Sequence, residues 1–235
     1  VPGASRDSIK RAMGLANSVS INIEAATPSG LAEISSTKDY NKDILKRLSW
    51  INSIEKHKST YPKSTHTTQL IVGANNETDK EILTRMGKIY KKSNLKRTYF
   101  SAFSPVEETE FKNKDPCDVS RTNKLYSADS LLNTYNYNVK ELVFDENDRL
   151  NINEDPKILA AKQMKIFPVE IKKATYRELI RVPGIGTKSA RKIINIRRKQ
   201  PFTDKEDLKK IGVVVKRAEP YIKIKGEYQS ELDSF

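Results

Sequence analysis

The sequence predicts an α/β fold followed by a small, basic, α-helical domain. In the first two thirds of the 235 residues, short runs with strand character alternate with stretches of helical period. This recurrence at βαβ spacing predicts a parallel sheet covered by helices, with about three strands, too few to close a barrel. Residues 170–228 hold 17 Lys and Arg against 7 Asp and Glu, which accounts for 10 of the net charge of +13.

Each predicted element has a local signal. Ser5 or Asp7 can cap a first helix, and Pro156 suits the first turn of a later one. Apolar side chains recur on one face of the other helices, while the strands are rich in β-branched and aromatic residues. The predicted helices cover 5–17, 38–57, 79–92, 121–135 and 156–164, and the predicted strands cover 19–26, 67–73, 96–103 and 221–225.

The predicted domain order follows these elements. We expect residues 104–120 to form a loop and residues 145–155 to form a solvated linker, because both are rich in charged and loop-forming residues. The predicted segments are the α/β unit with a helical extension at 1–145, a linker and helix at 146–168, a helical domain at 169–228 and a tail at 229–235.

A hairpin between two helices is the most informative motif. The segment 182–187 reads Val-Pro-Gly-Ile-Gly-Thr. Pro183 disfavours helix at the residue before it, so one helix should end at Val182. We expect positive φ at both Gly184 and Gly186, with Ile185 buried between them. The pattern is typical of a helix-hairpin-helix motif.

Such a hairpin directs backbone N–H groups outward at the start of the second helix, where they can hold a phosphate oxygen. Together with the clustered positive charge, this predicts contact with a nucleic-acid backbone, without reading of base sequence. We expect that Gly184→Val combined with Lys188→Glu would abolish most duplex binding and leave the fold intact. The predicted contact residues are Pro183, Gly184, Ile185, Gly186, Thr187, Lys188, Ser189 and Arg191.

A weaker second copy of the motif follows. Its hairpin has one glycine, Gly212, and its second helix starts near Lys216 and Arg217. We expect these three residues to contact nucleic acid as well, although a purely structural role for this copy stays open.

Several other classes of protein are excluded. No apolar run approaches the roughly 20 residues of a membrane span, so we expect a cytoplasmic or nucleoid-associated protein. A single cysteine, Cys117, excludes a disulfide framework and a cluster held by this chain's own cysteines. His57 and His66 lack metal-ligand spacing, so we expect no metal site. The chain begins at Val1 rather than Met, which leaves room for a segment upstream.

Taken over nearly its whole length, the chain resembles the C-terminal part of radical S-adenosylmethionine (SAM) proteins of the DNA modification or repair type. That family is associated with a uracil-DNA-glycosylase-like partner. The segments that carry the resemblance are 20–24, 68–74, 99–103, 125–129, 167–170, 179–190 and 207–218.

The resemblance implies the second half of a radical-SAM-type (β/α) barrel followed by the helix-hairpin-helix domain. It also implies that SAM and a [4Fe–4S] cluster serve the full-length protein, and that the cluster's Cys-x3-Cys-x2-Cys site lies in an N-terminal half or on a partner chain. Asn75 and Asn76 depart from the Pro-Gly that the family has in its turn near adenine. By motif position, the residues near the cofactor or substrate would be Asn22, Glu24, Gly73, Glu77, Thr78 and Ser101; no catalytic residue is assigned.

Three hypotheses therefore stand. The chain is the DNA-binding part of a radical SAM enzyme, with DNA favoured over RNA. Alternatively, it is a non-enzymatic nucleic-acid-binding or structural protein that retains the half-barrel without the cluster. A helix-hairpin-helix module for protein partners is the third, against which the clustered positive charge argues.

Overall fold

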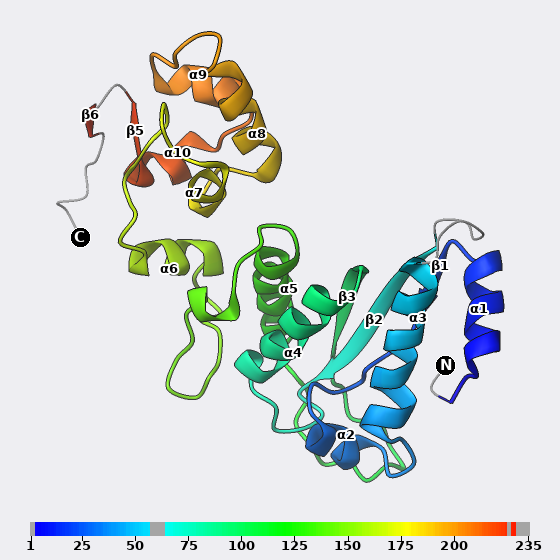
Figure 1. Ribbon diagram of the computed structural model, residues 1–235. Helices are drawn as coiled ribbons and strands as arrows, with labels where there is room; N and C mark the ends of the chain where they lie inside the picture. The colour runs from blue at the N-terminus through cyan, green and yellow to red at the C-terminus, as the bar shows by residue number, and fades with distance from the viewer. Residues whose placement is uncertain (1–2, 57–63, 225–226, 229–235) are drawn as a thin grey trace. The chain divides into compact units, whose positions relative to one another are not determined.

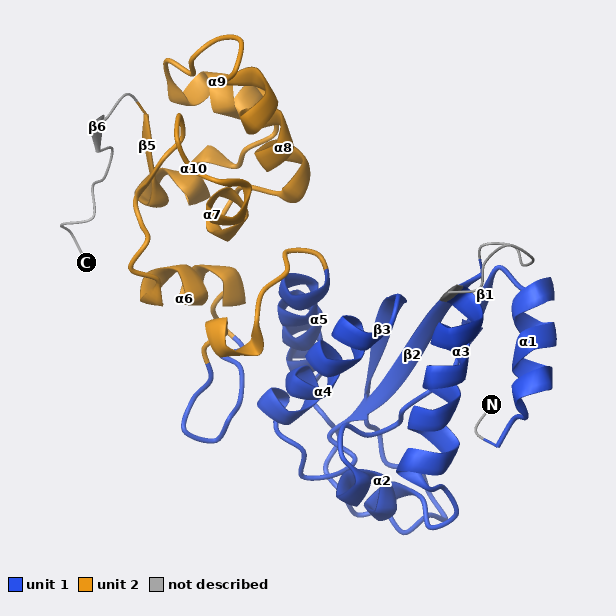
Figure 2. Cartoon of the chain, in the orientation of Figure 1, with its two compact units in different colours: residues 1–133, 144–152 blue, residues 134–143, 153–235 orange. Residues whose placement is uncertain are grey.

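The computed structural model describes residues 3–56, 64–224 and 227–228. It is a mixed α/β structure in which the chain forms two compact units, and each unit contains a small sheet (Figures 1 and 2). The first unit comprises residues 1–133 and 144–152, and the second comprises residues 134–143 and 153–235. The mixed α/β class is therefore confirmed, whereas the half-barrel stays a prediction.

The first unit is built on a three-stranded parallel sheet. Its strands β1 (Ser18–Ser20), β2 (Thr65–Val72) and β3 (Leu95–Ala102) lie in the order β1-β2-β3. Along β2, buried and half-buried side chains alternate, so one face of the strand is covered and the other is more open. The helical elements of this unit are α1 (Arg6–Leu15), α2 (Pro28–Ile34), the π-helical η1 (Tyr40–Leu45), α3 (Lys46–Lys56), α4 (Asp79–Lys92) and α5 (Val119–Asn133).

The first strand is shorter than the predicted strand at 19–26. Past Ser20 the chain still pairs with β2, since the Ile23 N–H donates to the Gln69 carbonyl at 3.1 Å. Glu24 then adopts a φ of 59°, which ends the extended conformation. Helix α2 follows directly and was not predicted, although Thr27 caps it and Pro28 occupies its first turn.

The helix predicted over 38–57 begins later, as a π-helical turn that leads into α3. Its predicted inner face is confirmed, because Ile44, Leu48 and Ile51 are all buried. His57 lies outside the described residues. Helix α5 ends at Asn133, two residues earlier than predicted. Its predicted apolar face is part of the core, because the following residues are buried: Leu125, Ala128, Leu131 and Leu132.

The predicted solvated linker at 145–155 is exposed at Asp145, Glu146 and Asn147, but Arg149 and Leu150 make contacts with the start of α4. Leu150 is buried, and its N–H donates to the Asp79 carboxylate at 2.9 Å. Arg149 donates to the Glu77 carbonyl at 2.9 Å. These contacts hold the segment against the start of α4, and the composition of the segment alone gave no sign of them.

The second unit is mostly helical. Its buried core includes Leu179, Ile185, Ala190, Ile193 and Leu208. In its small sheet, β4 (Val169–Glu170) pairs parallel with β5 (Ile222–Ile224), which pairs antiparallel with β6 (Glu227–Tyr228). Its helical elements are η2 (Val139–Glu141), α6 (Pro156–Gln163), α7 (Tyr176–Arg181), α8 (Thr187–Ile196), α9 (Lys205–Lys210), α10 (Val215–Ala218) and η3 (Glu219–Tyr221).

Candidate nucleic-acid interface

The first hairpin joins α7 to α8. Helix α7 ends at Arg181 with Val182 as its C-cap, as Pro183 predicts. Ile185 is 1% exposed and so fills the core beneath the turn. Gly184 has a φ of 82°, which confirms the expectation for that residue. Gly186 has a φ of −88° and serves as the N-cap of α8, so the prediction of positive φ there is wrong.

The start of α8 has no side-chain cap, because its N-cap residue is a glycine. Three neighbouring helices in the same unit differ in this respect: Asp155, Thr175 and Asp204 each accept a hydrogen bond from the first turn of α6, α7 and α9. The N–H groups in the first turn of α8 are thus left to another acceptor. Since the helix dipole is positive at this end, an anion suits the position.

Two of the predicted cations flank this turn. Lys188 and Arg191 are both exposed, and Thr187 is half-buried. The Arg191 guanidinium lies 6.0 Å from the centre of the Tyr176 ring. Pro183, in contrast, is buried and forms part of the turn's packing. Lys188 and Arg191 are therefore the predicted side chains best placed to meet a phosphate.

Ser189 has a partner within the protein. Its side chain is 6% exposed, and its hydroxyl donates to the Gly212 carbonyl at 2.9 Å. The contact expected between this hydroxyl and phosphate is therefore replaced by one to the second hairpin.

The second hairpin packs against the first. Gly212, with a φ of 90°, forms the turn between α9 and α10, and Val213 is buried behind it. The Val214 N–H donates to the Gly184 carbonyl at 2.9 Å. A Cβ atom on Gly184 would lie 2.4 Å from the Val214 carbonyl oxygen, closer than real contacts permit. The second copy therefore has a structural role at least.

The cations of the second copy differ in their surroundings. Lys216 is exposed. Arg217 donates to the Asp155 carboxylate at 2.7 Å, and this contact, together with the N–H groups of α6, outweighs burial and lowers the pKa of Asp155. A phosphate at Arg217 would thus compete with an internal carboxylate.

A buried arginine that the sequence analysis missed supports the first hairpin. Arg181 is 2% exposed and donates to the carbonyls of Tyr135 and Asn136, both at 3.0 Å. It also donates twice to the Glu141 carboxylate, at 2.8 and 3.1 Å, and its guanidinium lies 4.0 Å from the Tyr137 ring centre. Burial raises the pKa of Glu141, but Arg181 outweighs it, so the net shift is downward.

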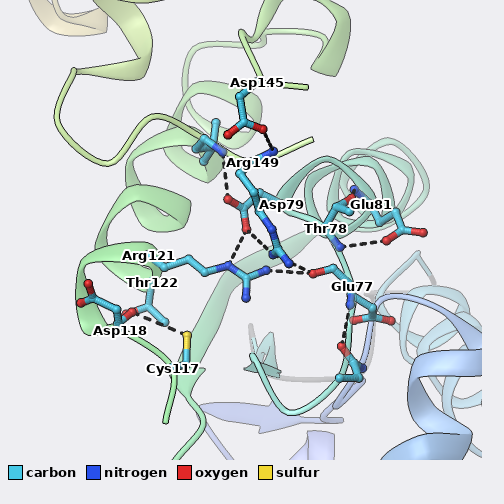
Figure 3. A network of polar contacts seen from close by, with 12 residues as sticks. Glu77, Thr78, Asp79, Glu81, Cys117, Asp118, Arg121, Thr122, Asp145 and Arg149 are labelled. Carbon is cyan, nitrogen blue, oxygen red and sulfur yellow. Dashed lines mark hydrogen bonds and ion pairs between the residues drawn. The ribbon is translucent and has the colours of Figure 1, made fainter. Parts of the chain in front are cut away.

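The residues that the SAM resemblance implies lie in the first unit, where Figure 3 shows the contacts around Glu77. Glu77 is 6% exposed, and its carboxylate accepts hydrogen bonds from the Ala26 N–H, the Thr27 N–H and the Thr27 hydroxyl. Thr78 caps α4 in a reciprocal pair with Glu81. Glu77 and Thr78 are thus engaged in holding loops together and do not fit a role as cofactor ligands.

Of the other four implied residues, Asn22, Glu24 and Gly73 lie beyond the carboxyl ends of β1 and β2, and Ser101 lies at the end of β3. Gly73, with a φ of 88°, packs so closely on Cys117 that an added Cβ would lie 2.7 Å from the cysteine Cβ.

Asn22 accepts a hydrogen bond from Ser20, and Glu24 lies 3.3 Å from the Lys38 ammonium. Ser101 accepts from the Gln69 amide at 2.8 Å. Asn22, Glu24 and Ser101 are not buried and could meet a ligand, so their implied role stays a prediction.

The described part of the chain also bears on metal binding and on insertion into membranes. Within residues 3–56, 64–224 and 227–228, no group of three or more His, Cys, Asp or Glu side chains could hold a metal ion. No helix in this described part of the chain is long and apolar enough to cross a membrane.

Comparison with known proteins supports the hairpin alone. No curated protein and no solved structure matches the chain. A family model described as a helix-hairpin-helix motif matches residues 165–218, the stretch that runs from before α7 to the end of α10. The second unit therefore contains a helix-hairpin-helix motif.

Proposed function

We propose that the chain binds nucleic acid through the phosphate backbone, held at the first hairpin of the second unit. The observation that carries the proposal is the uncapped start of α8, which follows Gly186 and is flanked by the exposed Lys188 and Arg191. The family match points the same way, because a helix-hairpin-helix motif suggests nucleic-acid binding.

The charge distribution supports a backbone-directed mode of binding. Residues 170–228 carry 10 of the 13 surplus positive charges. Lysines and arginines that neutralise phosphates release counterions, which makes affinity fall steeply with salt. Such contacts position a protein without reading sequence. The proposed ligand is therefore duplex DNA of arbitrary sequence, with DNA preferred to RNA on the resemblance given above.

Titration of a labelled DNA duplex at several salt concentrations tests the proposal. We expect log Kd to rise linearly with log salt concentration. Lys188→Gln should weaken binding and reduce the slope by about one, as for the loss of one phosphate contact. Lys199→Gln is the matched control, because Lys199 is also exposed but lies beyond the opposite end of α8. A flat salt dependence, or equal effects of the two variants, would contradict the proposal.

Gly186→Ala tests the approach of phosphate to the backbone. A Cβ atom here would have Tyr135 Oη as its nearest contact, at 3.9 Å, so the fold accepts it. The methyl group would stand at the uncapped start of α8, in the path of the phosphate. We expect weaker DNA binding with little change in thermal unfolding, and unchanged affinity would move the ligand away from this turn.

The radical SAM hypothesis is a separate, finer proposal. It rests on the resemblance, and Glu77 and Thr78 speak against part of the implied cofactor site because of their structural contacts. Iron and sulfide analysis of the native protein with any co-purifying chain tests it. About four irons per chain would support the enzyme, whereas an iron-free preparation would favour the non-enzymatic alternative. The uracil-DNA-glycosylase-like partner stays a prediction.

A further inference from the structure

A buried lysine lies beneath the hairpin. Lys157, in the first turn of α6, is 7% exposed. Its Nζ atom donates to the carbonyl of Ile185, the residue at the tip of the turn, at 2.8 Å. The same atom lies 4.3 Å from the centre of the Tyr135 ring. Its position is therefore set by the hairpin on one side and by an aromatic face on the other.

The groups that face Lys157 come from several elements. Arg217 of α10 and Arg181 of α7 are positive, while Asp155, the N-cap of α6, is negative. The Asp155 carboxylate is already engaged by Arg217 at 2.7 Å. Burial first, and then Arg217, lower the pKa of Lys157 to about 7, although Asp155 acts in the opposite direction. This lysine therefore changes between its charged and neutral forms near neutral pH, whereas a lysine at the surface stays charged there.

We propose that Lys157 links nucleic-acid binding at the first hairpin to the uptake of one proton. In its ammonium form, the side chain holds the Ile185 carbonyl and places a positive charge behind the uncapped start of α8. Arg181 and Arg217 are positive and disfavour a further positive charge on Lys157. A phosphate bound at the start of α8 adds negative charge nearby and so favours the protonated lysine. By reciprocity, protonation of Lys157 strengthens phosphate binding. This inference rests on the proposed function.

Two side chains of the described residues that could take part in proton exchange, His66 and Cys117, belong to the first unit and not to the unit that holds the hairpin. Asp129, whose pKa burial raises to about 7, also lies in the first unit. These groups remain unchanged in every variant of Lys157, so a difference in pH dependence between the variants is due to the lysine itself.

The test is the affinity for a DNA duplex between pH 6 and 9 at constant ionic strength. For the unchanged chain, we expect Kd to rise above pH 7, with a limiting slope of about tenfold per pH unit for one proton. Lys157→Arg, which stays charged throughout, should flatten the profile. Lys157→Met should also flatten it, at a weaker affinity. Lys162→Arg, in the same helix but exposed, should follow the unchanged chain.

Calorimetry of binding in two buffers of different ionisation enthalpy gives a second, independent readout. Net proton uptake at pH 7.5 by the unchanged chain, absent in Lys157→Met, supports the proposal. No uptake, or the same pH profile in all variants, would overturn it. If the duplex does not bind at any pH, the proposed function fails instead, so the two failures are distinguishable.

Discussion

Gly184 and Gly186 hold the hairpin in different ways. The positive φ of Gly184 and its contact with the Val214 carbonyl are demands of the fold itself. Gly186 has an ordinary φ and space around its Cα atom, so the fold itself makes no such demand there. The expectation that Gly184→Val leaves the fold intact is therefore contradicted by the contact with Val214.

We predict that Gly184→Ala lowers the free energy of unfolding by about 2 kcal/mol or more, from strain at positive φ and the clash with Val214. Gly186→Ala should cost at most about 1 kcal/mol, the usual range for an N-cap change. Urea unfolding of both variants measures the difference. Equal losses would show that the two glycines play the same part.

Asp129 carries a pH dependence of stability in the first unit. Burial raises the pKa of its carboxyl group to about 7, although the Tyr90 hydroxyl, at 2.8 Å from both carboxylate oxygens, lowers it in part. Between the ordinary value of 3.8 and about 7, the folded chain therefore binds more protons than the unfolded chain. Stability consequently falls as pH rises through this window and stays low above it.

We predict that the free energy of unfolding drops by about 2–3 kcal/mol between pH 5 and pH 8 on account of this carboxyl group. Asp129→Asn, which keeps the shape and removes the titration, should lose this part of the drop. Urea unfolding at the two pH values is the measurement, and an unchanged drop in the variant would assign it to other groups.

At the scale of elements, Arg181 ties α7 to η2 and to the two residues Tyr135 and Asn136 that precede it. Its guanidinium meets two carbonyls and a carboxylate, an arrangement that the planar fork of arginine suits and that the ammonium of lysine does not. We predict that Arg181→Lys costs about 2–3 kcal/mol of stability, despite the retained charge. Chemical unfolding measures this cost, and Arg177→Lys, at an exposed position of the same helix, is the control. A cost as small as that of the control would contradict the assigned role.

Elements with local end signals were predictable from the sequence. Ser5 before α1, Pro156 at the start of α6 and Pro183 after α7 act within a few residues, and the structure agrees with each. The failures depend on contacts distant in sequence. Leu150 is buried because Asp79, 71 residues earlier, accepts its N–H. The composition of the segment around Leu150 does not reveal this contact with Asp79.

The candidate site likewise contains residues that local sequence predicts and residues that only packing brings to it. The hairpin and its cations could be found because residues 182–191 contain the whole turn. Lys157 is 28 residues from Ile185, and Arg181 is 40 residues from Glu141. Their roles follow from packing, which a single sequence does not show.

At the scale of the whole molecule, the chain passes between its two units at 133–134, 143–144 and 152–153 (Figure 2). The second unit therefore needs residues 134–143 although they precede a segment of the first. We predict that a fragment of residues 134–228 melts about 10 °C or more above one of residues 153–228, because the shorter one leaves Arg181 buried without its partners. Thermal unfolding of the two fragments tests this; equal melting temperatures would show that residues 134–143 are dispensable.

The back-to-back packing of the hairpins has an evolutionary consequence. Selection on Gly184 comes from the protein's own second hairpin, through Val214, whereas under the proposed function selection on Gly186 would come from the bound phosphate. On that proposal, a descendant that stopped binding nucleic acid would still be held to glycine at position 184, while position 186 would be free to change to alanine or serine. Under the proposed function, glycine at position 184 would thus indicate that the fold has been kept, and glycine at position 186 would indicate that binding has been kept.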